Sequence, residues 1–248
     1  VSRMDSTVII PTGATEQHGP HMPLGVDAML SKAIAGAVAQ RIGALVAPVF
    51  SYGYKSQPRS GGGNHRMGTT SLGAGTLVGE LKDGVAASFM AQGFKNVVVL
   101  NGHFENYQFL YEGLDKAVSG ALHAGSTSRA VLMSYWDFVD EQTLEQVFPE
   151  GFLGWDIEHG GVLETSLMLL LHPELVQMDR VVDHPPAVLT SYDVFPEDPA
   201  RTPDSGCLSS AKNATAARGQ LLLDAVTAAV GTALSTELNL AVQMVEVE

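Results

Sequence analysis

The stretch that decides the fold is NVVVLNGHFEN, residues 96–106. Its first five residues form a short apolar run, which is typical of a strand buried on both faces of a parallel sheet. A polar cluster containing His103 and Glu105 follows at once. In an extended chain, residues i and i+2 project to the same side, so these two side chains can face one point in space.

The same arrangement occurs near the N-terminus. Residues 7–10 (TVII) predict another short buried strand, and the cluster TEQHGPH (residues 15–21) follows, with Asp27 a few residues later. Glu16 and His18 again stand two residues apart. Together the two clusters supply imidazole nitrogens and carboxylate oxygens, a ligand set that suits Zn²⁺ or Mn²⁺. The set is large enough for two ions that share a bridging carboxylate, and its members are Glu16, His18, Asp27, His103 and Glu105.

The remaining pattern predicts an α/β protein. Further strands are expected at 45–50 and 129–133, and they alternate with segments of helical spacing at 28–43, 70–92, 105–122, 160–171 and 209–235. This alternation favours a mostly parallel sheet covered on both faces. Ligands of such sheets bind beyond the carboxyl ends of the strands, where both clusters stand. The Pro- and Asp-rich residues 172–207 are expected to form an ordered excursion over the surface.

Length and composition narrow the class of protein. The chain has 248 residues and 45% hydrophobic content, enough for one domain spanning residues 1–248. There are 14 basic against 27 acidic residues, a formal charge of −13, which makes nucleic acid an improbable partner. No apolar stretch approaches the ~20 residues that cross a bilayer, and the N-terminus has no apolar signal region. Cys207 is the single cysteine, so a reducing cytoplasm fits best.

A third polar group lies in GWDIEHGG, residues 154–161, with Glu164 beyond it. Trp155 could cover a small planar ligand and exclude water, or belong to the core. Asp156 and Glu158 could face that ligand, or cap the helix that follows. His159 is a plausible general acid, because the ordinary pKa of histidine is near neutrality.

Other polar residues have less specific readings. The loop SGGGNH (residues 60–65) could supply backbone donors to a substrate, but it lacks the pattern of a nucleotide phosphate loop. No G-x-S-x-G sequence supports a serine nucleophile. A single histidine near the end of a strand is more often a hydrogen-bonded structural residue than a metal ligand. Only the presence of two such clusters favours a metal site. His21 is left unassigned, whereas His123 and His172 are taken as ordinary residues.

At these residues the chain resembles the creatininase family of metal-dependent amidohydrolases. The E-x-H-G and G-H-x-E motifs at 16–19 and 102–105 mark the family broadly. The stretches SGGGNH, SYWDF (134–138) and GWDIEHGG are more specific, and the resemblance covers nearly the whole chain.

The resemblance implies a single three-layer α/β/α sandwich, a homohexamer and two divalent metal ions, zinc or manganese. One ion would be held by Glu16, Asp27 and His103, and the other by His18, Asp27 and Glu105, which also has a catalytic role. His159 matches the proton donor, and Trp155 lies on a mobile flap. The positions expected to contact substrate are Ser60, Phe104, Trp136, Trp155, Asp156 and Glu158.

Two departures from the family pattern stand out. Phe104 occupies a position that is usually Tyr, so a hydroxyl contact to substrate is lost. The segment ahead of the first strand is shorter than usual, which affects an expected N-terminal helix and some subunit contacts.

The activity that the resemblance implies is reversible hydrolysis of the cyclic amide of creatinine to creatine, with water activated by the two metal ions. One alternative is a related binuclear enzyme that acts on another cyclic amide, a formamide or a small peptide. Another is a non-catalytic metal-binding module, in which the ligands would only hold structure.

Overall fold

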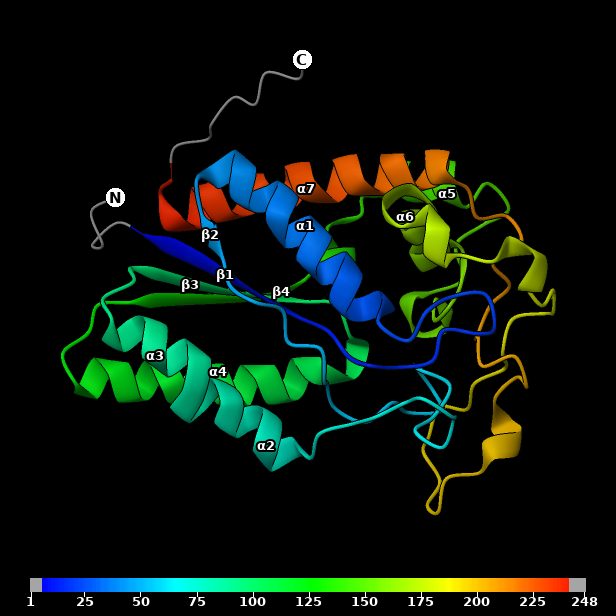
Figure 1. Ribbon diagram of the computed structural model, residues 1–248, viewed down its shortest axis with the longest axis horizontal. Coiled ribbons are helices and arrows are strands. Elements are labelled where there is room, and N and C mark those ends of the chain that lie inside the picture. The colour runs from blue at the N-terminus through cyan, green and yellow to red at the C-terminus, as the bar shows by residue number, and fades with distance from the viewer. Residues whose placement is uncertain (1–5, 241–248) are drawn as a thin grey trace.

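A four-stranded sheet of parallel strands, in the order β2-β1-β3-β4, lies at the centre of the molecule (Figure 1). The computed structural model describes residues 6–240, apart from the Lys82 side chain. The expected parallel sheet is confirmed. The short segment ahead of the first strand, residues 1–5, lies outside the described residues. The strands are β1 (Thr7–Thr12), β2 (Leu45–Val46), β3 (Asn96–Asn101) and β4 (Arg129–Ser134).

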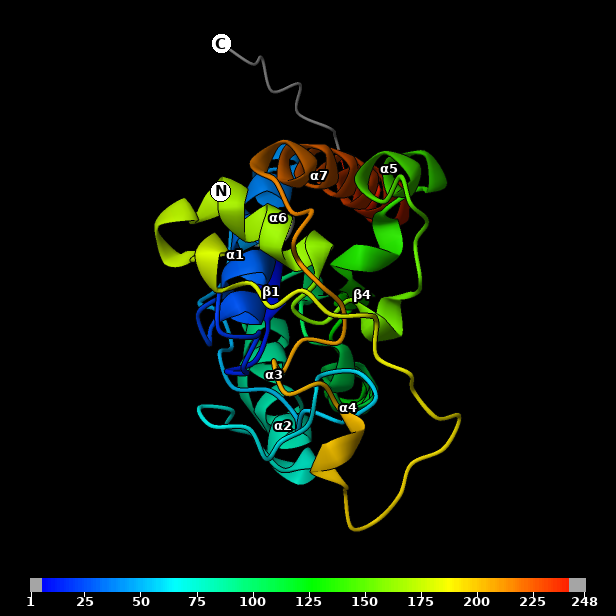
Figure 2. The same cartoon turned by 90° about the vertical axis from the view of Figure 1, so that its right-hand side faces the viewer.

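Helices cover both faces of the sheet, which confirms the three-layer α/β/α architecture (Figures 1 and 2). One face carries α1 (Val26–Ile42), α5 (Glu141–Val147), α6 (Val162–Leu171) and α7 (Ala216–Leu238). The other carries α2 (Ala74–Gly79), a π-helical turn (Glu80–Gly84), α3 (Val85–Ala91) and α4 (Tyr107–His123). Short 3₁₀ turns are Phe104–Asn106, Tyr135–Phe138, Trp155–Ile157, Pro173–Leu175, Met178–Arg180 and Pro199–Arg201.

Alternation along the strands divides the apolar side chains between two cores. In β3, Val98 and Leu100 pack with α1, α6 and α7, whereas Val97 and Val99 pack with the helices of the opposite face. All four side chains are at most 1% exposed. This two-sided burial explains why the strand shows as a continuous apolar run.

Three expected elements begin or end elsewhere than the sequence indicated, and one of them is the last helix, expected over 209–235 but observed over Ala216–Leu238. The helix expected from residue 70 begins at Ala74, because Thr70 donates its backbone N–H to Thr15 over 3.0 Å and is held in an extended bridge. The strand expected over 45–50 contains only Leu45 and Val46. Pro48 has no backbone N–H to donate, and pairing resumes at Phe50, which forms a single bridge.

The last helix, α7 (Ala216–Leu238), differs from the expectation that no apolar stretch is long enough to cross a bilayer. Its 23 residues are long and apolar enough to cross a bilayer by length and composition, although no such stretch was expected. Nine of its residues are buried, and the helix packs along α1 and α6. This packing is that of a core helix, because its apolar face is already covered by protein.

The excursion over residues 172–207 runs across the surface as loops and short 3₁₀ turns, coloured yellow to orange in Figure 1. Many of its side chains are exposed, and among the large hydrophobic ones Val188 and Phe195 are exposed most. Near its end, the backbone N–H of Leu208 donates to the carbonyl of His159 over 2.9 Å. The excursion therefore returns to the core beside the third polar group.

The register of the sheet brings the two polar clusters to one edge. Thr12 pairs with Asn101, which pairs with Ser134, so β1, β3 and β4 end level with one another. The start of α1 packs against the turns that follow β1 and β3. A Cβ atom on Gly102 would lie 2.7 Å from the carbonyl oxygen of Asp27, so only glycine allows this approach. Asp27, in the first turn of α1, is thereby placed between the two clusters.

Candidate metal centre

The first cluster lies in the loop that follows β1. The backbone N–H of Glu16 donates to the carbonyl of Leu24 over 2.9 Å, which closes the loop and returns the chain to the start of α1. The Nδ1 atom of His18 lies 3.1 Å from the carbonyl oxygen of Glu16. Because that carbonyl can only accept, Nδ1 carries the proton, and Nε2 of the neutral ring is left as a free ligand atom.

The second cluster follows β3 and is held by Asn101. Its side-chain oxygen accepts from the backbone N–H of His103 over 3.1 Å, and its amide donates to the carbonyl of His103 over 2.8 Å. Nε2 of His103 lies 3.0 Å from the carbonyl oxygen of Tyr54, to which it donates. Nδ1 of His103 is therefore the ligand atom of this ring.

Asp27 connects two groups of ligand atoms through its two oxygens. Oδ2 lies 2.9 Å from Nδ1 of His103, and Glu16 Oε2 lies 3.2 Å from the same nitrogen. Oδ1 of Asp27 lies 3.0 Å from Nε2 of His18, and Glu164 Oε1 lies 3.4 Å from that nitrogen. One group thus contains Glu16, Asp27 and His103, and the other contains His18, Asp27 and Glu164. The five side chains are almost completely buried.

The charges of the centre are unbalanced in a way that two divalent cations would correct. Burial raises the pKa of Glu16 to about 7, although His103 beside it acts in the opposite direction. Burial would also raise the pKa of Asp27, but the neighbouring His18 and His103 more than offset this and hold it below its ordinary range. Burial would lower the pKa of His18, yet Glu164 and Asp27 raise it well above the usual value. Protons on the imidazoles thus compensate the carboxylates when no cation is bound.

Several buried polar atoms at the centre also lack a hydrogen-bond partner. They are Glu16 Oε1, His18 Nε2, Asp27 Oδ2 and Glu105 Oε2. An unpaired polar atom in the interior is costly, so a cluster of them directed at one region indicates that something else satisfies them. The carboxylate and imidazole donors, with a shared aspartate, fit two divalent ions such as Zn²⁺ or Mn²⁺.

Glu105 was expected among the ligands of the second ion, but the described residues place Glu164 there. Glu105 belongs to none of the groups of ligand atoms that the structure brings together. Its Oε1 accepts from the backbone N–H of Gln57 over 2.8 Å and from the Ser60 hydroxyl over 2.6 Å. Its unpaired Oε2 lies 3.4 Å from Nε2 of His103, on the side of the ring that donates to Tyr54.

From the sequence, Glu164 was recognisable only as a polar residue beyond His159 and was not predicted to be a metal ligand. The available signal was an acid in the first turn of the apolar helix VLETSLMLLL, where nothing on a solvated face explains it. The other oxygen of Glu164 accepts from the backbone N–H of Gly160 over 2.7 Å. This bond fixes the carboxylate, so that Oε1 faces His18.

A small cavity of about 50 Å³ opens beside the ligand atoms. Its aromatic wall brings together segments that are far apart in the sequence. Phe104 and Trp136 stack with ring centroids 6.2 Å apart, and Trp155 packs edge-on against Phe152 at 4.6 Å. The polar lining includes Ser60, as expected. The cavity could therefore hold a small planar molecule against the metal centre.

The predicted substrate contacts Asp156 and Glu158 differ in their placement. Asp156 is exposed and does not line this cavity, so the structure does not bring it to the centre. Glu158 does line the cavity, but its Oε2 accepts from the backbone N–H of Leu163, near the start of α6, over 3.0 Å. Glu158 therefore accepts a hydrogen bond from the first turn of α6, as the helix-capping alternative requires, and its contact with substrate stays a prediction.

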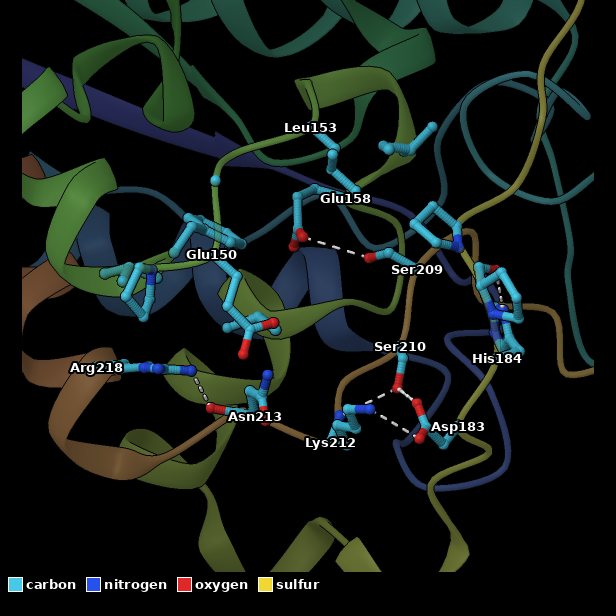
Figure 3. Close-up of a pocket in the computed structure, with 18 residues that line it drawn as sticks. Glu150, Leu153, Glu158, Asp183, His184, Ser209, Ser210, Lys212, Asn213 and Arg218 are labelled. Atoms are coloured by element: carbon cyan, nitrogen blue, oxygen red, sulfur yellow. Dashed lines mark hydrogen bonds and ion pairs between the residues drawn. The ribbon is translucent and has the colours of Figure 1, made fainter.

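Glu158 also borders a second cavity, of about 490 Å³. Figure 3 shows its carboxylate directed toward Ser209, whose hydroxyl donates to Oε1 over 3.3 Å. Asp183 and Lys212 form an ion pair farther along the wall, at 2.9 Å. Burial raises the pKa of Glu158 to about 7. The side chain of Glu158 thus lines both cavities and lies between them.

His159, the expected proton donor, lies against the centre with its ring 4.3 Å from that of His18. Its Nε2 donates to the carbonyl of Gln17 over 2.8 Å, and its Nδ1 lies 3.9 Å from Glu16 Oε2. Burial, together with the nearby His18, lowers the pKa of His159 well below its ordinary value. The ring is therefore neutral, and it must first accept a proton at Nδ1 before it can donate one.

A parallel α/β sheet with two buried nitrogen and oxygen ligand groups at its carboxyl edge defines a protein with a binuclear metal site. The family is given by comparison with known proteins. Residues 1–234 match the family model described as creatinine amidohydrolase, and the chain belongs to the creatininase family.

Relatives support this placement, one of them over almost the full length of the chain. A creatinine amidohydrolase from Pseudomonas putida is 52% identical over 239 residues, which cover 96% of this chain and 92% of the relative. A mycofactocin precursor peptide peptidase from Mycobacterium ulcerans is 32% identical over 193 residues, covering 73% of this chain and 65% of the relative.

Solved structures agree with the fold described above. A manganese creatininase superposes with a TM-score of 0.92 at 52% identity, covering 94% of this chain and 91% of its own. A mutant creatininase of a type with two zinc ions gives the same four values. A mutant creatininase complexed with creatine superposes with a TM-score of 0.93 at 51% identity, covering 96% and 94%.

Proposed function

We propose that this protein is a creatinine amidohydrolase, which catalyses the reversible hydrolysis of the cyclic amide of creatinine to creatine. The observation that carries the proposal is the pair of buried ligand groups joined by Asp27 and opening onto a small aromatic cavity. The 52% identity to a creatinine amidohydrolase and the likeness to a creatine complex support the choice of substrate.

Two divalent ions would be held by the groups that share Asp27, one with Glu16 and His103 and the other with His18 and Glu164. When bound, such ions supply Lewis acidity, which lowers the pKa of water and polarises an amide carbonyl. They would also replace the protons that balance the buried carboxylates. Zinc and manganese both accept these ligands.

His159 would move the proton between the water and the leaving nitrogen. Its Nε2–H is held by the carbonyl of Gln17, so Nδ1 presents a lone pair toward the centre. The neutral ring would accept a proton at Nδ1 from the attacking water. It would then give that proton to the ring nitrogen as the carbon–nitrogen bond breaks, and this nitrogen becomes part of the guanidino group of creatine. The same path in reverse would serve ring closure.

The aromatic wall would orient the substrate and exclude water. Trp136 and Phe104 offer a stacked pair of rings along one side of the cavity, and Trp155 stands on a short 3₁₀ turn at its margin. A planar heterocycle between such rings is desolvated and positioned for attack. Ser60 and Glu105, linked at 2.6 Å, would provide the polar contacts.

The direct test is creatine formation from creatinine by purified protein, before and after removal of metal with a chelator, followed by re-addition of zinc or manganese. We expect activity, its loss and its recovery. The relationship to a peptide peptidase makes peptide cleavage the second candidate, and the alternatives of another cyclic amide or a formamide belong in the same panel. Rapid turnover of one of these without any creatine formation would overturn the proposal.

The protein would work as a homohexamer in the cytoplasm. The assembly rests on the resemblance to the creatininase family, and the location on the single cysteine. Light scattering on the eluting protein would test the assembly, since a hexamer has six times the 26.2 kDa mass of the chain. A monomeric active species would refute it.

A further inference from the structure

Gln17 stands between the ligands Glu16 and His18, and its side chain makes a separate set of contacts. The residue is 8% exposed. Its amide nitrogen donates to the carbonyl of Gly206 over 2.8 Å and to that of Gly61 over 3.4 Å. Its side-chain oxygen accepts from the backbone N–H of Gly19 over 3.1 Å. One carboxamide therefore joins three loops that are far apart in the sequence.

The backbone of Gln17 contacts the ring of His159. Nε2 of His159 lies 2.8 Å from the Gln17 carbonyl oxygen and 3.1 Å from its side-chain nitrogen. The carbonyl can only accept and the amide nitrogen can only donate, so the ring nitrogen cannot satisfy both. The shorter contact assigns the proton to Nε2. The amide nitrogen then uses its two hydrogens on the carbonyls of Gly206 and Gly61, so the carboxamide of Gln17 and Nε2 of His159 all have partners.

The loops are closely fitted to this carboxamide. Gly206 has φ +85°, and a Cβ atom there would lie 1.9 Å from the side-chain oxygen of Gln17. A Cβ atom on Gly62 would lie 3.0 Å from the amide nitrogen of Gln17 and 2.7 Å from the carbonyl oxygen of Gly206. Side chains at these positions would push the loops apart, so both glycines match the close approach.

The glycine loop held in this way carries groups that contact the centre. Ser60 precedes Gly61, and its hydroxyl donates to Glu105 over 2.6 Å. The backbone at Gly61 also passes so near to Glu16 that a Cβ atom would lie 2.2 Å from Oε1. A shift of this loop would therefore move Ser60 and Glu105 relative to the ligand atoms.

We propose that Gln17 is a positioning residue, whose carboxamide clamps the loops at residues 60–63 and 205–208 so that Ser60 and Glu105 are placed for reaction beside His159. The inference rests on the proposed creatinine hydrolysis for its kinetic consequence. Its structural part, the clamping of two loops, stands on the hydrogen bonds themselves.

The test replaces Gln17 by methionine, Gln17→Met, which keeps the length of the side chain and removes its donors and acceptor. Because small displacements in an active site are costly, we expect kcat for creatinine to fall by about 10- to 100-fold, with KM changed by less than about threefold. Metal content should stay at the wild-type value. Amide hydrogen exchange should accelerate in peptides covering 57–63 and 205–208.

A double-mutant cycle that combines Gly206→Ala with a substitution of Gln17 isolates the contact between these two residues. Gly206→Ala should lower kcat strongly in the wild type and much less in a Gln17→Ala background, because alanine at position 17 removes the side-chain atoms with which the new Cβ collides. Gly93→Ala is the matched control: Gly93 has the same φ of +85°, but a Cβ atom there would meet nothing within 4 Å. Its kcat should equal that of the wild type.

Three results would overturn the inference: unchanged loop exchange in Gln17→Met, additive effects in the cycle, or a loss of activity that follows loss of metal and is restored by adding it. If the wild type does not hydrolyse creatinine, the proposed function has failed. In that case, amide hydrogen exchange in the two loops still tests whether Gln17 clamps them.

Discussion

Replacing Asp27 by asparagine, Asp27→Asn, should remove both metal sites at once. The two carboxylate oxygens lie 3.0 Å from His18 Nε2 and 2.9 Å from His103 Nδ1, so one side chain serves both ligand groups. Asparagine has nearly the same shape, but its neutral amide is a poor ligand and its nitrogen faces one imidazole. We expect metal content, measured by atomic absorption after dialysis, to fall from two ions per chain to well below one.

The stability cost has two parts. Without metal, the variant leaves buried imidazolium groups short of a partner, and breaking a buried pair costs about 3–5 kcal/mol. With metal at a hundred times its dissociation constant, each ion stabilises the wild type by about 2.7 kcal/mol, a gain that the variant should lack. One kcal/mol corresponds to roughly 2–4 °C in a chain of this size, so the metal-free Tm should fall by roughly 6–20 °C.

Asp183→Asn provides the matched control. Asp183 also forms an ion pair at 2.9 Å, with Lys212, but both side chains are more than half exposed. Solvent screens such a pair, so Tm should change by less than about 2 °C and metal content should not change. An Asp27→Asn variant that retained two ions per chain, or that zinc still stabilised as much as the wild type, would refute the bridging arrangement.

Three further substitutions test separate parts of the centre. Glu164→Gln should lose one of the two ions, because its Oε1 faces His18 at 3.4 Å; two retained ions in the same metal assay would argue against it as a ligand. Glu158→Gln should weaken the pH dependence of stability. Burial raises the Glu158 pKa from 4.5 to about 7 in the folded protein, so the stability from its protonation is complete below pH 4.5 and is lost as the pH rises through 7. In urea unfolding of the metal-free proteins, the wild type should lose about 3 kcal/mol more over this range than the variant, which keeps the contribution of Glu16; parallel pH curves would contradict this. Phe104→Tyr adds the hydroxyl that the family resemblance predicts at this position, and one hydrogen bond should lower KM for creatinine by about two- to tenfold. An unchanged KM would show that the hydroxyl does not reach substrate.

The sequence predicted most of the architecture because its signals are local. The run at 96–100 and the helical spacing at 28–43 each needed only a few neighbouring residues to be recognised, and both elements are present. The helix expected from residue 70 was misplaced because a distant partner, Thr15, holds that backbone extended. Local propensity could not reveal a pairing across more than fifty residues.

The candidate site divides in the same way. Glu16 and His18, or His103 and Glu105, were recognisable as pairs because their spacing of two puts them on one side of an extended chain. Which carboxylate completes the second group depended on the packing of α6 against α1, and the structure brings Glu164 there. In the sequence, Asp156 and Glu158 were equally good candidates for substrate contact or for helix capping. Only the three-dimensional arrangement shows that one is exposed and the other caps α6.

Two cations sharing Asp27 at the carboxyl edge of the sheet would be visible in an anomalous-scattering map from crystals grown with zinc. We expect two peaks beside Asp27, one in contact with Glu16 and His103 and the other with His18 and Glu164. A single peak, or peaks away from these side chains, would contradict this arrangement.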